Sequence, residues 1–236
     1  MFFKLKIDFQ NQMNKALHFL AKITAALFHP IFMFFYGFLL MLSLKPHWFG
    51  VHHIQEQHLM IVLVFIYTCF IPIIGIVVLK KIGFIQTFEI QEKRERIAPL
   101  MICLVFYLWL WVNLKNQDSI PSVLIAFVLS TIIALSMSFV INNWIKISLH
   151  AVGISAFLGL WLKIRFYHSQ DGVFFFRFQP DHVSGFHLHH LIFISILAAG
   201  WIGSSRLLLK AHEHREIYIG YLVGFLSVII AFAITF

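Results

Sequence analysis

The sequence predicts an all-α membrane protein, a polytopic bundle of about six to seven transmembrane helices. Of its 236 residues, 60% are apolar and only 12% are charged, and the mean hydropathy is +0.86. Soluble domains carry about a quarter charged residues, which excludes an ordinary soluble enzyme and a disordered chain. Apolar runs of about 20 residues, the length a helix needs to cross the hydrocarbon core, also recur along the chain.

Seven apolar segments are candidate spans. We predict them at 23–44, 59–79, 97–114, 120–141, 147–162, 183–202 and 216–236. The fifth segment is short, and the sixth opens with polar residues. Pro30 and Pro72 lie inside the first two spans. Each proline removes a backbone hydrogen bond, so we expect a kink at both positions.

Residues 1–22 mix lysines with Phe, Leu and Ala ahead of the first span. They lack a small-residue cleavage site, so we predict an interfacial helix and not a signal peptide. No repeat or low-complexity tract interrupts the chain, and we treat 1–236 as a single transmembrane domain. Cys69 and Cys103 fall inside apolar runs, where we expect buried thiols without a disulfide.

The formal net charge is +8. In a membrane protein a basic excess indicates cytoplasmic loops and lipid headgroups as partners, and not nucleic acid. Seven spans place the segments 80–96, 142–146 and 203–215 on the same side as the N-terminus. This side carries more Lys and Arg, which favours the cytoplasm. The orientation stays open, because some of these cations are candidates for catalysis.

Ionisable groups at the membrane boundary are functional candidates by default, and three clusters fall on that side. The first is 89–96, with Lys93, Arg94 and Arg96 just before a span. Its simplest interpretation is a positive-inside anchor with internal Glu–Lys pairs.

The second cluster opens the fifth span with Lys146, Ser148 and His150. Backbone N–H groups at a helix start can hold a phosphate oxygen, helped by the positive end of the helix dipole. The simpler alternative is an N-cap serine beside a lysine that reaches toward the headgroups.

The third cluster, 205–216, precedes the last span and contains Arg206, His212 and Glu216. Arg206 could bind a phosphate through two hydrogen bonds, and His212 could attack phosphorus. Glu216 lies four residues after His212, on the same helix face, where it could accept a hydrogen bond and fix the imidazole tautomer. The alternative is an ordinary charged turn at the membrane surface.

The pattern Ser-Arg, five residues, His, three residues, acid at 205–216 resembles the terminal signature of the type 2 phosphatidic acid phosphatase superfamily. Residues 148–150 resemble its middle motif, usually Pro-Ser-Gly-His, in a form similar to bacterial branches. The Arg-rich run before Pro99 resembles a degenerate first motif, Lys, six residues, Arg-Pro. The resemblance covers 89–236.

The chain departs from the family pattern at four places. Glu89 stands where the first motif has Lys, and Pro99 does not directly follow an Arg. Leu149 replaces the usual Gly, and Glu216 replaces the usual Asp. The third motif is therefore specific, the second less so, and the first weak.

The resemblance implies a metal-independent lipid phosphatase without a cofactor, in the bacterial inner membrane. His212 would be the nucleophile that forms a phosphohistidine, Glu216 would orient it, and His150 would protonate the leaving group. Six side chains would hold the phosphate oxygens, namely Arg206, Ser148, Lys146, Lys93, Arg94 and Arg96. The implied substrate is a lipid phosphate or polyprenyl diphosphate whose tail stays in the bilayer.

Two other interpretations remain open. The opposite side is rich in histidine, and His187, His189 and His190 could belong to a metal-binding protein or transporter. The degenerate first motif is also compatible with a relative that has lost activity and has a structural role. The sequence does not indicate the oligomeric state.

Overall fold

The computed structural model describes residues 2–90, 92–168, 173–179 and 182–236; for 2–12, 168, 173–179, 182–184 and 186 only the backbone is described. In the described chain, the α-helices are α1 (Phe2–Leu27), α2 (Pro30–Leu44), α3 (His58–Phe65), α4 (Ile71–Lys81), α5 (Ile97–Lys115), α6 (Ser122–Ile141), α7 (Leu149–Lys163), α8 (Leu188–Leu208) and α9 (His214–Thr235). Short 3-10 turns cover Pro46–Phe49, Ile54–Gln57 and Arg94–Arg96, and π-helical turns cover Ile66–Phe70 and Ile164–His168.

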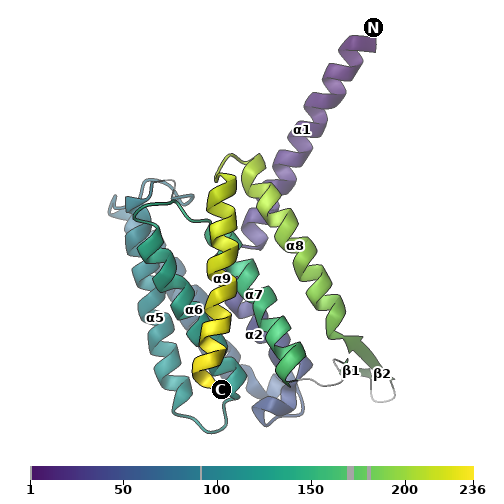
Figure 1. Cartoon of the computed structure of the whole chain (residues 1–236), viewed down its shortest axis with the longest axis vertical. Helices are drawn as coiled ribbons and strands as arrows, with labels where there is room; N and C mark the ends of the chain where they lie inside the picture. Colours follow the sequence, from purple (N-terminus) through teal and green to yellow (C-terminus); the bar gives the residue numbers. More distant parts are fainter. Residues whose placement is uncertain (1, 91, 169–172, 180–181) are drawn as a thin grey trace.

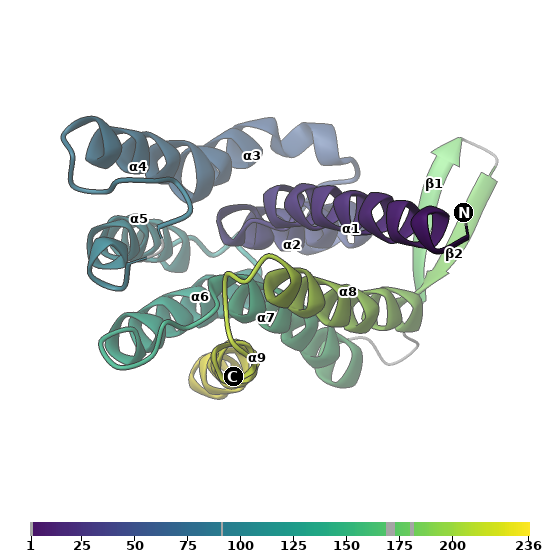
Figure 2. The same cartoon turned by 90° about the horizontal axis from the view of Figure 1, so that it is seen from above.

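The predicted fold class is confirmed. Within the described residues, six helical segments are long and apolar enough to cross a membrane, and a bent pair of helices would make seven. Helices α2 to α9 run side by side in one bundle (Figure 1). Seen from above, α7 lies between α2, α8 and α9, while α4 and α5 form the opposite side (Figure 2).

The first predicted span is broken in two. Helix α1 runs past residue 22 to Leu27, and α2 leaves it at an angle of 62°. Pro30 explains the break, because it has no N–H to donate and forces the preceding residue out of the helical region. His29 accordingly has an extended backbone, with φ −61° and ψ 135°. That the N-terminal segment lies in the interface stays a prediction.

The second span bends less, because a wider turn accommodates Pro72. The π-helical turn Ile66–Phe70 lies directly before that proline and joins α3 to α4 in one long helical segment. A π turn shifts the carbonyls that a proline ring would otherwise meet. The fifth span is likewise extended by Ile164–His168, which gives α7 enough length to cross.

The predicted start of the sixth span at residue 183 is wrong. Strands β1 (Val173–Gln179) and β2 (His182–His187) form an antiparallel hairpin, with Val173 paired to His187, and α8 begins only at Leu188. We predicted a loop between two spans for the seven residues of β1. They are rich in Phe and Val, which also favour strands. The hairpin lies at the end of α8 opposite the α8–α9 turn (Figure 1).

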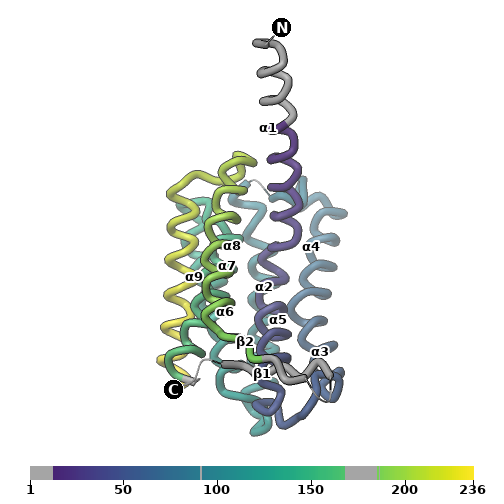
Figure 3. The backbone as a smooth tube through the Cα atoms, turned by 90° about the vertical axis from the view of Figure 1, so that its right-hand side faces the viewer, coloured from purple at the N-terminus to yellow at the C-terminus, as the bar shows by residue number. Residues whose placement is uncertain are grey.

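Helices α7 and α9 are in backbone contact where α9 carries Gly220 and Gly224. A Cβ atom at Gly220 would lie 2.7 Å from the carbonyl oxygen of Ser148, and one at Gly224 would overlap the carbonyl of Val152. This Gly-x-x-x-Gly spacing lets membrane helices approach closely. It fixes the beginning of α9 against the beginning of α7, at the end of the bundle opposite the C-terminus (Figure 3).

Candidate active site

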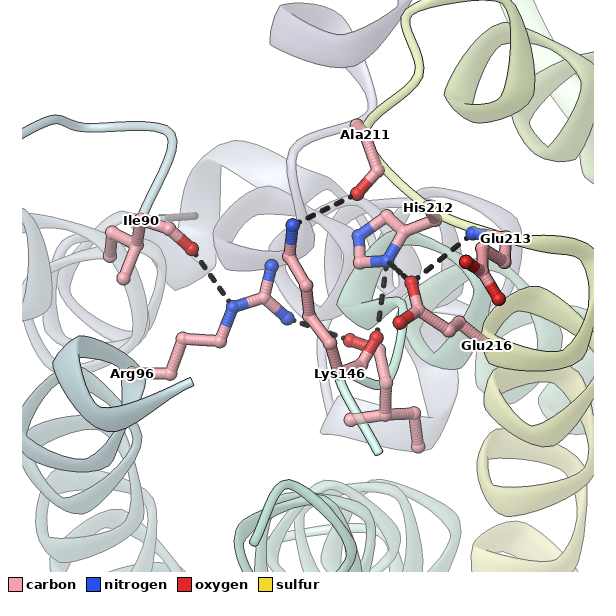
Figure 4. Close-up of polar contacts among 8 residues, drawn as sticks. Ile90, Arg96, Lys146, Ala211, His212, Glu213 and Glu216 are labelled. Carbon is pink, nitrogen blue, oxygen red and sulfur yellow. Dashed lines mark hydrogen bonds and ion pairs between the residues drawn. The ribbon is translucent and has the colours of Figure 1, made fainter. Parts of the chain in front are cut away.

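The three predicted clusters meet at one end of the bundle. The α4–α5 connection, the start of α7 and the α8–α9 turn converge there, and backbone carbonyls of residues 146–147 link them. Arg96 donates from Nη1 to the carbonyl of Ile147 at 2.9 Å, and His212 Nδ1 lies 3.2 Å from the carbonyl of Lys146 (Figure 4). The prediction that the clusters share one side is confirmed.

The α8–α9 turn explains the five-residue spacing between Arg206 and His212. Helix α8 ends in a Schellman turn, in which Lys210 N–H bonds to the Leu207 carbonyl and Ala211 N–H to the Arg206 carbonyl. Lys210 takes the left-handed backbone conformation that this turn requires, with φ 52°. The chain therefore reverses within a few residues, and His212 follows directly.

His212 is held as one tautomer. Its Nδ1 lies 2.8 Å from Oε2 of Glu216, so Nδ1 carries the hydrogen and donates it to this carboxylate. The same Oε2 accepts a bond from the backbone N–H of Glu213 at 3.2 Å, which caps α9. Because Nδ1–H is engaged, the lone pair is on Nε2, which makes no hydrogen bond to any described residue.

The environment of His212 keeps the ring neutral. Burial, followed by the positive charges of Arg96, Arg206 and Lys146, lowers the pKa of His212 to about 3. The side chain is 2% exposed. At neutral pH the ring is then an uncharged base with a free lone pair, the form that a nucleophilic histidine requires.

Arg96 is a buried cation with a fixed direction. Its Nε donates to the Ile90 carbonyl at 2.9 Å, in addition to the bond from Nη1 to Ile147. Ile90 has a φ of 43°, which is rare for a β-branched residue and aims its carbonyl at the guanidinium. Two backbone carbonyls thus place Arg96 beside His212 and leave Nη2 available.

Arg206 is the least engaged cation of the site. Its buried Nε has no hydrogen-bond partner, and no hydrogen bond joins its guanidinium to any other residue that the structure describes. Glu89 is its main electrostatic neighbour. A buried donor without a partner is costly, and a bound anion would satisfy it. This arrangement suits a phosphate ligand.

His150 is bound from outside the three clusters. Its Nε2 lies 3.0 Å from the carbonyl oxygen of Ala25 in α1. A carbonyl only accepts, so Nε2 carries the hydrogen and Nδ1 is the nitrogen left for a substrate. The ring of His29, next to the α1–α2 break, meets His150 edge-on at 5.6 Å.

An apolar cavity of about 460 Å³ lies beneath these polar groups. Arg96, Arg206, His150 and His212 line its polar end. Its apolar walls come from α2, α4, α5, α6 and α7 and include Phe34, Ile76, Leu100, Tyr107, Phe127 and Ala156. Between Arg96 and Tyr107 the helical rise gives a depth of about 16 Å.

Four predicted phosphate-binding residues do not line this cavity. Lys93 is exposed and donates to the carbonyl of Trp144 at 2.8 Å, and Arg94 is exposed. Lys146 donates to the Ala211 carbonyl at 3.1 Å (Figure 4), and burial lowers its pKa. Ser148 is the N-cap residue of α7, and its buried hydroxyl has no partner among the described residues.

Sequence reasoning missed three contributors to the site, namely His29, Ile90 and the carbonyl of Ala25. His29 had a detectable signal, since a polar residue directly before a proline inside an apolar run marks a broken helix. The Ile90 conformation and the Ala25 contact depend on backbone geometry and carry no signal in residue type.

The histidines of the alternative metal site are at the far end of α8. His187 and His190 meet ring to ring at 5.8 Å, and Arg165 Nε donates to His189 Nε2 at 3.4 Å. Among the described residues, no group of three or more His, Cys, Asp or Glu side chains is placed to hold a metal ion.

Comparison with known proteins gives no relatives. No protein-family model matches the chain, and neither does any curated protein or solved structure.

Proposed function

We propose that this protein is a metal-independent phosphatase of the bacterial inner membrane, which hydrolyses a lipid phosphate or diphosphate through a phosphohistidine on His212. One observation carries the proposal. A neutral imidazole, tied to Glu216 through Nδ1, has its free Nε2 beside Arg96 and Arg206 at the polar end of an apolar cavity. The sequence resemblance stated above is independent support.

The first chemical step forms a bond between Nε2 of His212 and phosphorus and breaks the bond to the leaving oxygen. Glu216 accepts the Nδ1 hydrogen bond throughout and stabilises the positive charge that develops on the ring. Protonated His150 gives its Nδ1 proton to the leaving oxygen, a contribution of about 10²–10⁴-fold. Water then attacks the phosphohistidine, His150 takes the proton from that water, and inorganic phosphate leaves.

Arg96 and Arg206 would hold the phosphoryl oxygens. Their charge matters most in the transition state, when the phosphoryl group is loosely bonded to both its neighbours. Arg96 is already oriented by two backbone carbonyls, so it loses little freedom when a phosphate binds. Glu89 stands beside Arg206 and would oppose the phosphate charge.

The apolar cavity would take the hydrocarbon tail of the substrate. Its arginines and histidines lie at one end and most of its other lining residues are apolar, which matches an amphiphile with one charged head. A water-soluble phosphate ester would leave this apolar surface without a partner. We therefore expect tailed substrates to be preferred over soluble ones.

Phosphate release by the purified protein in detergent and EDTA tests the proposal, with phosphatidate and a polyprenyl diphosphate as substrates. His212→Ala should abolish release, whereas His214→Ala, an exposed histidine two residues on, should not. A folded sample that releases no phosphate from either lipid would overturn the proposal and favour a structural role. Activity that survives in His212→Ala would overturn the phosphohistidine mechanism.

A further inference from the structure

The last turn of α1 is docked onto the bundle by side chains from three other helices. Trp201 on α8 donates from Nε1 to Thr24 Oγ1 at 2.8 Å, and Tyr36 on α2 donates to the Leu27 carbonyl at 3.1 Å. The third contact is the bond of 3.0 Å between His150 Nε2 and the Ala25 carbonyl. The docking of α1 thus includes a residue of the candidate active site.

The Ala25 carbonyl is available because the helix ends there. The last carbonyls of a helix have no partner within it. The N–H of Phe28 bonds to the Thr24 carbonyl and that of His29 to the Ala26 carbonyl. Because the helix breaks before Pro30, neither N–H bonds to the Ala25 carbonyl. His150 supplies the missing donor. Without the break, the N–H of residue 29 would occupy this carbonyl.

This contact matters for proton transfer because it uses one of the two nitrogens of His150. With Nε2–H donated to Ala25, a second proton can reside only on Nδ1, the nitrogen left for a substrate. Arg206, His29 and His212 line the same cavity as this ring, and the His29 ring meets it edge-on at 5.6 Å. The carbonyl end of α1 carries the negative end of the helix dipole and favours an imidazolium.

We propose that the last turn of α1 is part of the catalytic machinery, with the Ala25 carbonyl as the positioning group that makes His150 a proton donor through Nδ1. This inference rests on the function proposed above and extends the site beyond the three clusters. The α1–α2 break then has a catalytic role, because it leaves the Ala25 carbonyl without a donor in α1 and directs it toward α7.

The docking contacts can be weakened without touching the cavity. Neither Trp201 nor Tyr36 lines it. Trp201→Phe combined with Tyr36→Phe removes two hydrogen bonds that hold the turn, and Thr24→Val removes one of them independently. Trp109→Phe is the matched control. Trp109 lies on the exposed surface of α5, away from α1, and its Nε1 donates to the hydroxyl of Tyr67 in the turn Ile66–Phe70.

The experiment compares decyl phosphate with p-nitrophenyl phosphate. The alkoxide of decyl phosphate needs a proton as it leaves, whereas nitrophenolate leaves unaided. Both substrates share the later hydrolysis of the phosphohistidine, in which His150 acts as base, so the readout is the single-turnover rate of leaving-group release. We expect the double variant to lower this rate for decyl phosphate about tenfold, because partial loss of positioning removes part of the acid contribution. Single-turnover release of nitrophenolate should stay within about twofold of wild type. Thr24→Val should also slow decyl phosphate selectively, with a smaller loss of rate than the double variant. His150→Gln should show the same selectivity with a larger loss of rate.

Several outcomes would overturn the inference. Equal losses with both substrates would indicate a structural role for α1, and unchanged rates with both would show that the docking is irrelevant. A loss as large in Trp109→Phe would point to general destabilisation. If His150→Gln slowed single-turnover release of the leaving group equally for both substrates, then His150 would not be the acid. If the wild-type protein released no phosphate from either substrate, the proposed function on which the inference rests would be overturned instead.

Discussion

Glu216 and His212 are joined by a hydrogen bond of 2.8 Å between Oε2 and Nδ1, one helical turn apart in the chain. The same carboxylate oxygen caps α9 through the N–H of Glu213. One side chain therefore fixes both the tautomer of the proposed nucleophile and the start of the helix behind it. The Glu216 side chain is long enough for this one oxygen to reach both donors.

Replacing Glu216 should cost activity far more than stability. We expect Glu216→Ala to lower kcat by about 10²–10⁴-fold, because the ring loses its orientation and its counter-charge. Loss of the cap should lower the free energy of unfolding by about 1 kcal/mol. Steady-state kinetics and thermal unfolding in detergent measure the two effects. Glu216→Ala with full activity would contradict the assigned role. Glu56→Ala is the control, because it likewise removes a capping carboxylate, but in the turn Ile54–Gln57 between α2 and α3.

The protonation of His212 should be insensitive to pH near neutrality. With a pKa of about 3, the folded ring stays neutral between pH 5 and pH 8. In the unfolded chain a histidine binds a proton below about pH 6.5. The unfolded state then holds more protons between these values, so this group's contribution to stability is complete above about pH 6.5 and falls as the pH drops toward 3.

The imidazole ¹⁵N chemical shifts of His212 test this prediction, with the resonances assigned by difference from His212→Asn. Thermal unfolding adds a second readout, since wild type should lose more stability than His212→Asn when the pH falls from about 7 to about 5. A ring that titrates near pH 6.5 in the free protein would contradict it.

The contact between α7 and α9 predicts opposite effects at different glycines. Gly220→Ala should destabilise the protein by about 1–3 kcal/mol, since its Cβ would lie 2.7 Å from the Ser148 carbonyl, and backbone must move to admit it. Gly200→Ala is the matched control, because nothing lies within 4 Å of its Cβ position on α8. It should be neutral or stabilise by up to about 1 kcal/mol. Thermal unfolding in detergent decides between these outcomes.

Glu89 should weaken substrate binding. Its carboxylate is the main electrostatic neighbour of Arg206 and stands where the family resemblance expects Lys. We expect Glu89→Gln to lower KM by about two- to fivefold, the range of an exposed charge interaction, and Glu89→Lys to lower it further. Glu92→Gln, exposed and outside the cavity lining, is the control. A rise in KM in Glu89→Gln would contradict this prediction.

A larger side chain inside the cavity should lower kcat/KM for substrates with long hydrocarbon tails. Thr131 lines the apolar cavity about 10 Å below Ser138 along α6. We expect Thr131→Phe to lower kcat/KM for alkyl phosphates with long chains about tenfold and to leave short ones unchanged, because only long chains reach that depth. Val140→Phe, on the exposed surface of the same helix, is the control. Equal effects on all chain lengths would argue that the tail lies elsewhere.

The fold could be predicted further than the site. Span number follows from hydropathy and length, and the pair His212 and Glu216 follows from helical periodicity. Arg96 could not be separated from Lys93 and Arg94, because a cation run before a helix does not reveal which side chain turns inward. The hairpin was missed because a short run of Phe and Val after a span suits a strand or a loop equally well. The role of Ala25 was hidden, since any residue type can present a carbonyl.

The glycine contact between α7 and α9 fixes the reacting groups, whereas other helices form the far wall of the cavity. Backbone touches backbone where Gly220 meets Ser148, so the distance between the proposed nucleophile and proton donor is set by the main chain. Helices α4 and α5 wall the cavity from the opposite side, and the connection between them supplies Arg96 and Glu89 to its lining. The width of the tail compartment can therefore be redesigned through α4 and α5 while the reacting groups keep their registration.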